Sequence, residues 1–164
     1  MDLVVLVGLQ GAGKSAFYSA RFADTHAHVS RDLFPGARDP RARQRALVEA
    51  AARAGRPAVV DDTNVRREDR TELVALARAL GMRPVLYFFP PDVRASLSRN
   101  ASRTGRARVP PVAIRATLAR LAPPDASEGF AAAWEVTATE GGFSVVPRPD
   151  LAAGDPGASR PAPR

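Results

Sequence analysis

The sequence predicts an α/β protein in which a central parallel sheet of about five strands is flanked by helices. Short apolar runs rich in β-branched residues alternate along the chain with stretches that carry a helical apolar stripe, and this order is typical of parallel sheets. The first apolar run ends in a glycine-rich segment that leads directly into a helical stretch. A chain of 164 residues is long enough for one domain with a buried core.

The strands are predicted from apolar runs, which are typical of strands buried on both faces of a sheet. The run from Leu3 to Val7 is continuous and ends at a glycine, and the run "RPAVVDDTN" ends in two acids, a threonine and Asn64. "RPVLYFF" is a further buried run, whereas "HAHVS" and "WEVTAT" are weaker candidates. The predicted strands are 3–7, 26–30, 56–64, 83–89 and 134–139.

The helices are predicted from apolar stripes and from the residues that cap them. Asp39 and Pro40 supply a cap and a first turn, and Gly55 ends the helix that follows. A stripe of apolar residues ends in the same way at Gly81, and the segment "PPD" caps the next helix. The predicted helices are 14–23, 40–54, 68–80, 93–103 and 112–121.

Composition limits the domain organisation and the class of partner. The segment after residue 146 is rich in Pro, Gly and Ala, so we expect one folded domain over 1–146 and a disordered tail over 147–164. No apolar run reaches the roughly 18 residues of a membrane span, which predicts no membrane partner and a cytoplasmic location. The net charge of +7 favours an acidic partner such as nucleic acid or nucleotide, although an Arg- and Ala-rich composition alone also gives basic proteins.

The glycine-rich segment matches the phosphate-loop pattern G-x-x-x-x-G-K-[ST]. Gly8, Gly13, Lys14 and Ser15 occupy the fixed positions, between a buried strand and a helix. Glycines let successive backbone N–H groups point inward around phosphate oxygens, and the helix aims its positive end at the same anion. Lys14 is the only lysine in the chain, and we expect it to reach the β- and γ-phosphates of a nucleoside triphosphate while Ser15 binds Mg²⁺.

The stretch "HVSRD" places Arg31 and Asp32 at the exit of the second strand. Ligands of open α/β sheets bind beyond the carboxyl ends of the strands, so both side chains are expected to face the phosphate loop. A carboxylate there can accept the proton of an attacking hydroxyl; a plain surface turn is the alternative. We expect His26 and His28 to be structural or to lie at the edge of the substrate site, since two histidines without a suitably spaced carboxylate are a weak metal signal.

The stretch "VVDDTN" ends a buried strand with polar residues. An acid at this position commonly serves the Mg²⁺ shell or positions the substrate. Asp61 and Asp62 cannot both be buried at low cost while ionised, so we expect one to face the site and the other the loop or solvent. Thr63 and Asn64 are candidates for substrate contact, with capping of the next helix as the alternative.

The stretch "SLSRNASRTGRARVP" carries four arginines. Arg99 and Arg103 are four residues apart and are expected to share one helix face, whereas Arg106 and Arg108 follow in a loop. A mobile arginine-bearing segment over the triphosphate can neutralise charge on the transferred phosphoryl group. A solvated basic face is the alternative interpretation.

These stretches together resemble the kinase domain of the polynucleotide 5′-hydroxyl kinases of phage and animal end-healing enzymes. The resemblance lies in their order, namely the phosphate loop, "HVSRD", "VVDDTN", the arginine-rich segment with "VP", and "PPDASEGF". It covers about residues 3–137. It implies a P-loop kinase fold with a helical arginine-bearing lid, and transfer of the γ-phosphate of ATP to a 5′-hydroxyl end of DNA or RNA with Mg²⁺.

The resemblance also implies a role for each matching residue. Asp32 would be the general base, Arg103 would stabilise the transition state together with Lys14, and residues 128–130 would be structural. The residues expected to contact ATP are Gly8, Gly11, Ala12, Gly13, Lys14, Ser15, Ala16 and Arg99. The residues expected to bind the substrate are Arg31, Asp61, Thr63 and Asn64, and those expected to bind the metal are Ser15 and Asp61.

Two positions depart from the family pattern, since Ser30 and Asp62 stand where the family has Asn. Members of the family usually carry a phosphatase or ligase domain on the same chain; nothing after residue 147 fits one, so we expect such end-repair activities on separate partners. Two other functions stay open. One is a kinase for a hydroxyl of a sugar, nucleoside or antibiotic, and the other is a nucleotide-binding module without chemistry of its own.

Overall fold

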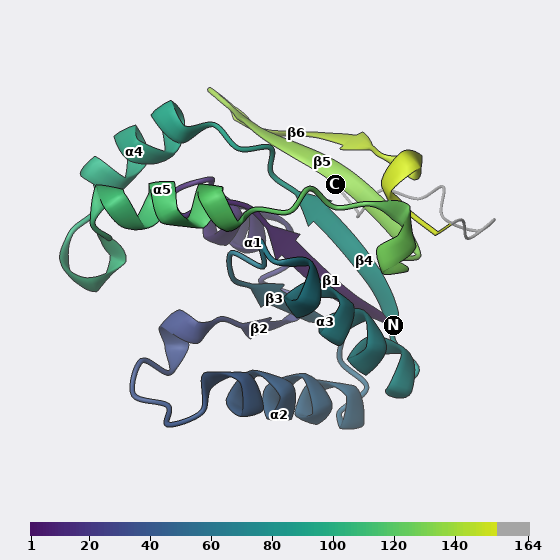
Figure 1. The fold of residues 1–164 in the computed structure, drawn as a ribbon. Helices are drawn as coiled ribbons and strands as arrows, with labels where there is room; N and C mark the ends of the chain where they lie inside the picture. The colour runs from purple at the N-terminus through teal and green to yellow at the C-terminus, as the bar shows by residue number, and fades with distance from the viewer. Residues whose placement is uncertain (154–164) are drawn as a thin grey trace.

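A computed structural model describes residues 1–153, which form a six-stranded sheet in the order β2-β3-β1-β4-β5-β6 (Figure 1). Strands β1 to β5 pair in parallel and β6 pairs with β5 antiparallel. The strands are β1 (Asp2–Val7), β2 (Ala27–Val29), β3 (Ala58–Asp61), β4 (Arg83–Phe88), β5 (Ala132–Thr139) and β6 (Gly142–Pro147). The predicted α/β fold with a mostly parallel sheet and flanking helices is confirmed.

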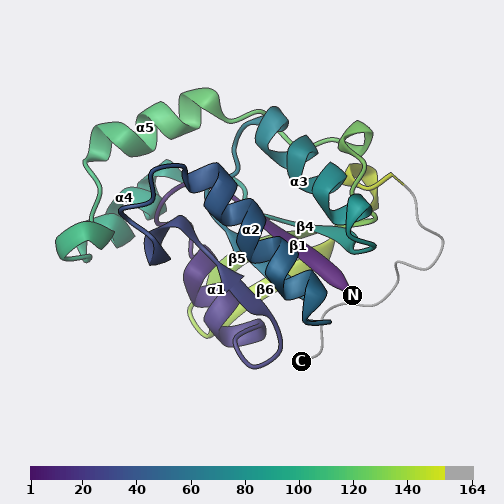
Figure 2. The ribbon, with the colours of Figure 1, turned by 90° about the horizontal axis from the view of Figure 1, so that it is seen from below.

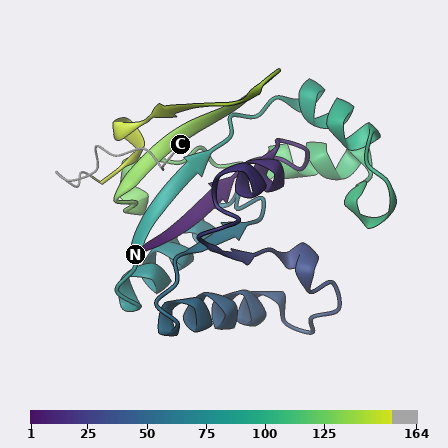
Figure 3. The same cartoon turned by 180° about the vertical axis from the view of Figure 1, so that it is seen from behind.

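Helices cover both faces of the sheet. The α-helices are α1 (Lys14–Arg21), α2 (Pro40–Arg53), α3 (Arg67–Ala79), α4 (Val93–Ala101) and α5 (Pro111–Arg120). Helices α2 and α3 lie side by side on one face (Figures 1 and 2), and α1 lies on the other (Figure 3). Helices α4 and α5 pair beyond the end of the sheet where β1 and β4 terminate (Figure 1).

The alternating side chains of β1 explain why the two helical layers form. Leu3, Val5 and Val7 pack with apolar residues of α2 and α3, while Val4 and Leu6 pack with the aromatic side chains of α1 and its C-terminal end. All five are at most 2% exposed. A strand buried on both faces needs apolar residues at every position, which is the pattern of this run.

The hairpin of β5 and β6 differs from the prediction, which ended with a single strand at 139. Glu140 and Gly141 form the turn between two β-branched runs, and Gly142 has a φ of 146°. The boundary expected at 146 falls inside β6, and the chain then continues through a short 3-10 helix, Pro149–Leu151. Leu151 packs into the core beside the sheet, so the fold extends beyond the expected boundary; the rest of the expected tail, 154–164, lies outside the described residues.

The remaining predicted elements are present with shifted ends. The strand expected over 56–64 stops at Asp61, so its last three residues lie in a loop. The helix expected over 93–103 stops at Ala101. Within residues 1–153, no helix combines the length and the apolar character that crossing a membrane requires.

Candidate active site

The phosphate loop connects β1 to α1 and is tightly packed against its neighbours. A Cβ atom at Gly8 would lie 2.8 Å from the Cβ of Phe89, and one at Gly11 would lie 2.6 Å from the carbonyl oxygen of Ser96. Gly13, with a φ of 101°, precedes the first residue of α1 in the left-handed region. Glycine is required at these positions because any side chain would clash or strain the backbone.

Lys14 is folded into this loop rather than extended into solvent. Its Nζ donates hydrogen bonds to the carbonyl oxygens of Gly8 (2.9 Å) and Leu9 (2.7 Å), and the residue is 8% exposed. Burial lowers the pKa of Lys14 to about 8, although the nearby carboxylates of Asp61 and Asp62 oppose the shift. The loop therefore holds a compact cation that gains from a phosphate anion.

A cavity of about 260 Å³ opens in front of the phosphate loop. Its walls come from the phosphate loop, from the exits of β2 and β3, and from the segment after α4. The lining residues are Gln10, Gly11, Gly13, Lys14, Ser15, Ser30, Arg31, Asp32, Asp61, Asp62, Thr63, Arg103, Arg106, Ala107 and Val109. Segments far apart in the sequence thus meet at the carboxyl edge of the parallel strands, as open α/β sheets require.

Both acids of the "DD" pair line the cavity, although we expected one of them to face the loop or solvent. Each has a partner that reduces the cost of placing two carboxylates side by side. Asp62 lies 2.7 Å from Arg31 Nε and accepts a hydrogen bond from the Thr63 N–H. Burial raises the pKa of Asp62, and the Arg31 charge opposes that shift. Asp62, one of the two positions that depart from the polynucleotide kinase pattern, is therefore the partner of Arg31.

Asp61 is held by a histidine. Its Oδ2 atom lies 3.0 Å from His28 Nε2, and its side chain is 3% exposed. The His28 ring stacks on Tyr18 of α1 with centroids 3.8 Å apart and an interplanar angle of 10°. His28 was expected to be structural or at the substrate edge, and its partner was not foreseen. The contact leaves the Oδ1 atom of Asp61 for other ligands.

Asn64 lies elsewhere than expected. It is buried beneath the loop, its amide donates a hydrogen bond to the carbonyl oxygen of Leu6 (2.8 Å), and its φ is 45°. Asparagine is one of the few residues that tolerate this left-handed conformation. The residue fixes the path of the chain from β3 to α3. Unlike Asp62 and Thr63, it is not one of the cavity-lining residues, so the structure does not place it where we expected a substrate contact.

The loop around Asn64 is anchored by a fully buried ion pair. Arg70 of α3 donates to both carboxylate oxygens of Glu128 (2.7 and 2.6 Å), and both side chains are 0% exposed. Arg70 also donates to the carbonyl oxygens of Asn64 and Val65. This network gives Glu128 in the "EGF" stretch the structural role expected of it.

The arginines of the segment expected to form a lid lie differently from the prediction. Arg103 follows the end of α4, so it does not share a helix face with Arg99. Residues 102–108, which we call the arginine loop, are closed by two hydrogen bonds between Asn100 and Val109 (2.7 and 3.0 Å). Arg103 and Arg106 line the cavity.

Arg99 lies at a second hollow, of about 180 Å³, on the other side of the phosphate loop. Its Nη1 atom donates to the carbonyl oxygen of Gly11 (3.1 Å). The other walls come from Ala12, from the segment 89–92, from α4 and from residues 136–138 of β5. This hollow was not expected from the sequence. The Gly141-Gly142 pair between two β-branched runs was the signal for the hairpin beside it.

The carboxylates of the site do not form a metal cage. No group of three or more His, Cys, Asp or Glu side chains within residues 1–153 is arranged to hold a metal ion. Ser15 and Asp61 nevertheless share the cavity. Mg²⁺ is commonly bound by one or two protein ligands together with substrate phosphates rather than by a protein cage, so these two residues fit that mode of binding.

The phosphate loop on a mostly parallel sheet, with an acid and arginines across the cavity, defines a P-loop kinase-type, ATP-dependent phosphotransferase. The model of the family described as "AAA domain" matches residues 3–124, and the chain belongs to this family. Comparison with curated proteins gives no significant match.

Solved structures of several functions share the fold. A chain of the Pnkp1/Rnl/Hen1 RNA repair complex is 25% identical with a TM-score of 0.62, covering 73% of this chain, which spans 43% of that one. A gluconokinase from Sinorhizobium meliloti is 21% identical, with a TM-score of 0.54 and 82% of each chain covered. Kti12 from Chaetomium thermophilum, solved with ADP-AlF3, is 16% identical, with a TM-score of 0.59, 76% of this chain and 82% of that one covered.

Proposed function

We propose that the protein is a polynucleotide 5′-hydroxyl kinase, which transfers the γ-phosphate of ATP to a 5′-hydroxyl end of DNA or RNA. The observation that carries the proposal is the meeting of Lys14, Asp32 and Arg103 in one cavity. These residues supply a phosphate ligand, a candidate base and a cation for the transferred group, which are the parts that phosphoryl transfer needs.

The donor half of the reaction uses the phosphate loop. The backbone of the loop and the N-terminus of α1 would hold the β- and γ-phosphates, with Lys14 between them. The hollow beside Arg99 is on the other side of the loop and is large enough for part of the nucleoside, so we assign it to the base of ATP. Arginine suits this position because its planar guanidinium stacks on aromatic rings.

The acceptor half of the reaction uses Asp32, which is exposed at the cavity. Asp32 takes the proton of the 5′-hydroxyl as its oxygen attacks the γ-phosphorus. A new O–P bond forms, the bond from the γ-phosphorus to the β–γ bridging oxygen breaks, and ADP leaves with that electron pair. Lys14 and Arg103 stabilise the charge on the transferred phosphoryl group.

Mg²⁺ would be held by the Ser15 hydroxyl and the Asp61 carboxylate together with the phosphates of ATP. It would neutralise phosphate charge when bound. His28 keeps the carboxylate of Asp61 in a fixed orientation through the 3.0 Å contact. Lys14 and Ser15 are the first two residues of α1, so one short segment would orient both groups toward the donor.

A polymeric acceptor is supported by charge and by likeness. The net charge is +7, and the cavity is lined by arginines from two segments, Arg31 after β2 and Arg103 with Arg106 after α4. The chain is similar to part of a protein in an RNA repair complex. Phosphatase or ligase partners on separate chains would then process the same ends.

A labelling assay tests the proposal. A 5′-hydroxyl oligonucleotide, offered as DNA and as RNA, should acquire label from γ-labelled ATP, and an oligonucleotide that already carries a 5′-phosphate should not. Asp32→Ala should lower labelling by about 10²- to 10⁴-fold, the range of general-base catalysis, while ATP binding measured by calorimetry is retained. Absence of labelling with wild-type protein and both polymers would overturn the proposal.

A small-molecule hydroxyl kinase is the second candidate, favoured by the similarity to a gluconokinase over 82% of both chains. The same Asp32 chemistry would act on a sugar, nucleoside or antibiotic hydroxyl. Salt separates the two, because a polymer binds more weakly as salt rises through counterion release and a neutral sugar does not. If ATP binds, no acceptor is labelled and Asp32→Ala changes nothing, a nucleotide-binding module is the better description.

A further inference from the structure

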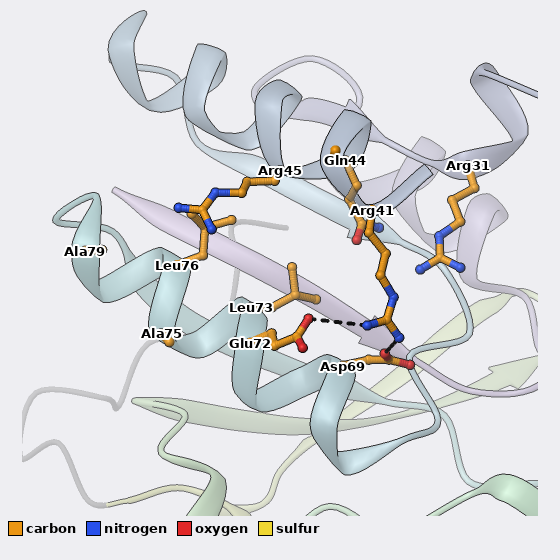
Figure 4. Close-up of a pocket in the computed structure, with 11 residues that line it drawn as sticks. Arg31, Arg41, Gln44, Arg45, Asp69, Glu72, Leu73, Ala75, Leu76 and Ala79 are labelled. Atoms are coloured by element: carbon orange, nitrogen blue, oxygen red, sulfur yellow. Dashed lines mark hydrogen bonds and ion pairs between the residues drawn. The ribbon is translucent and has the colours of Figure 1, made fainter. Parts of the chain in front are cut away.

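A groove of about 500 Å³ separates α2 from α3 on the sheet face opposite α1 (Figure 4). Arg31 lines both this groove and the 260 Å³ cavity in front of the phosphate loop. In Figure 4, Arg31 lies at one end of the groove, Arg41 stands in the middle and Arg45 lies toward the other end. The two hollows therefore share a lining residue, Arg31.

The groove between α2 and α3 matters because the cavity in front of the phosphate loop is small. Ligand pockets commonly measure about 300–1,000 Å³, and the cavity at the phosphate loop is smaller than that. This cavity has to accommodate the terminal phosphate of ATP and the reacting hydroxyl, so the rest of a larger acceptor must extend outside the cavity. Arg31 marks the wall at which an anionic acceptor can pass into the groove.

The groove has cationic groups along its length and an apolar side. Arg31, Arg41 and Arg45 line it together with Leu73 and Leu76 of α3. This combination suits a nucleotide, whose phosphate binds guanidinium groups and whose base packs on apolar surface. Asp69 and Glu72 also line it, but both engage Arg41, at 2.5 Å and 3.7 Å.

The carboxylates position the arginines and leave donors free. A guanidinium has five N–H donors. Arg31 forms an ion pair with Asp62, with Nε 2.7 Å from Oδ2, and neither atom has a hydrogen-bond partner among the residues that the structure describes. Arg41 is fixed across the groove by its contacts to α3, and Arg45 pairs with Glu49 one turn along α2. Arginines held in this way lose less conformational freedom when they bind a phosphate.

Gln44 provides an independent sign of an incomplete site. It is 6% exposed, lines the groove, and its Nε2 atom has no hydrogen-bond partner among the residues that the structure describes. Figure 4 shows its amide directed toward the groove beside Arg41. A buried polar group without a partner is costly and rare. Because the nitrogen is covered, the amide has to turn further toward the groove for a polar ligand atom to satisfy it.

We propose that the groove between α2 and α3 binds the second nucleotide of the acceptor strand, counted from the 5′-hydroxyl. The first nucleoside places its hydroxyl at Asp32 and its 3′-phosphate at Arg31. The second places its base against Leu73 and Leu76, and its 3′-phosphate at Arg41 and Arg45. This inference rests on the proposed polynucleotide kinase activity and specifies how the acceptor extends away from the reacting end.

An acceptor-length series tests the groove. The kcat/KM for phosphorylation is measured with a nucleoside 3′-monophosphate, the dinucleotide 3′-phosphate and a hexanucleotide, all with a free 5′-hydroxyl. The step from mononucleotide to dinucleotide should raise kcat/KM about tenfold, as expected for at least one charge-assisted hydrogen bond. The step from dinucleotide to hexanucleotide should be smaller.

Two tryptophan variants on α2 form a matched pair. Ala42 is exposed and lines the groove, so Ala42→Trp fills it, whereas Ala46, exposed one turn further along the same helix, is not one of the groove-lining residues. Ala42→Trp should remove the tenfold gain from the second nucleotide, and Ala46→Trp should keep it. Equal length dependence in the two variants would overturn the inference while the labelling of oligonucleotides still upholds the kinase activity.

Gln44→Leu supplies a variant that does not depend on bulk. Replacing an unpaired buried amide with an apolar side chain of similar size should raise the thermal unfolding temperature, while the KM for the dinucleotide rises about fivefold or more. A variant that is more stable and equally active on the dinucleotide would show that Gln44 has no ligand role and would count against the groove.

A direct binding measurement distinguishes nucleotide binding in the groove from the proposed kinase activity. The anisotropy of a hexanucleotide labelled at its 3′ end is measured with wild-type protein and with both tryptophan variants. If oligonucleotides are not phosphorylated but bind, and Ala42→Trp alone weakens binding about tenfold, the kinase proposal fails and the groove stands as a nucleotide site. If wild-type protein neither phosphorylates nor binds the hexanucleotide, both proposals fail.

Discussion

The phosphate-binding part of the proposed donor half and the proposed acceptor half of the site are built in opposite ways. The phosphate-binding part is one continuous segment, from Gly8 to Ser15, in which Lys14 is buried and hydrogen-bonded to the carbonyls of its own loop. The acceptor half combines the exit of β2, the exit of β3 and the arginine loop. Of its charged groups, Asp32 and Arg106 are exposed and Arg103 is half-buried.

The difference shows what fixes each half. A phosphate has the same shape in every nucleotide, so a local backbone arrangement is enough to hold it. An acceptor varies in size and charge, and the residues that select it come from separate elements that loop variation can change without loss of the fold. Solved structures that share this fold accordingly include a gluconokinase and a chain of an RNA repair complex.

The largest effect we expect concerns two residues that are far apart in the sequence but are buried, unlike the exposed residues of the acceptor half. Glu128 and Arg70 are 58 positions apart yet fully buried, so Glu128→Ala leaves a buried charge without its partner. The free energy of unfolding should fall by about 3–5 kcal/mol, measured by urea denaturation. As a control, Arg67→Ala removes a more exposed pair with Asp125 near the same two segments and should cost far less; similar losses in the two variants would contradict the argument.

The arginine loop allows a comparison within the acceptor half. Arg103 lines the cavity, whereas Arg108, in the same loop, is exposed and is not one of the lining residues. Arg103→Ala should lower kcat by about 10²- to 10³-fold, as for loss of one group that stabilises transition-state charge, with little change in the KM for ATP. Arg108→Ala should leave kcat nearly unchanged in the same steady-state assay. A larger loss for Arg108→Ala would place the functional cation elsewhere in the loop.

The donor half should respond to pH through Lys14. Its pKa in the free protein is lowered to about 8, and bound triphosphate favours the charged form, so binding draws a proton above that pH. Binding is therefore strongest below about pH 8 and should weaken up to tenfold per pH unit above it, measured by calorimetry with ATP and a chelator. Proton uptake from the buffer should accompany binding, and Lys14→Met should abolish both effects. An affinity that stays constant between about pH 8 and pH 10 would contradict the lowered pKa.

The smallest effect concerns the Arg31–Asp62 pair, whose side chains are 41% and 18% exposed. Asp62→Asn keeps the shape but removes the charge that orients Arg31, so the KM for the acceptor should rise by about fivefold, corresponding to roughly 1 kcal/mol. Asp62→Asn in the Arg31→Gln background should then add little, because Asp62 acts through Arg31, as a double-mutant cycle would show for a coupled pair. Fully additive losses would mean that the two residues act independently.

The phosphate loop could be predicted from the sequence because the pattern that identifies it is local. The phosphate-loop residues are consecutive, and the flanking apolar run and helix have the right periods. The same local signals predicted β1 and β4 to within about two residues at each end. Arg31 and Asp32 were identified in the same way, as polar residues at the exit of a strand.

The side chains with which these residues interact could not be predicted from the sequence. Asp62 was expected to compete with Asp61 for burial, but Arg31 and His28 satisfy one carboxylate each, and such pairings depend on register between strands. Arg103 was placed on a helix by its spacing from Arg99, yet the helix ends at Ala101 before reaching it. Pairing across distant elements is decided by packing, which periodicity alone does not encode.

The two hydrogen bonds between Asn100 and Val109 have a consequence for the entropy of binding. They join the ends of the eight-residue segment 101–108, which contains the arginine loop. Closing a flexible segment of this length costs roughly 2 kcal/mol in loop-closure entropy, and here that loss occurs on folding. When Arg103 and Arg106 contact a phosphoryl group, little more than their own side chains therefore has to become ordered. Their guanidinium groups can be mobile in the free protein and still bind the phosphoryl group tightly.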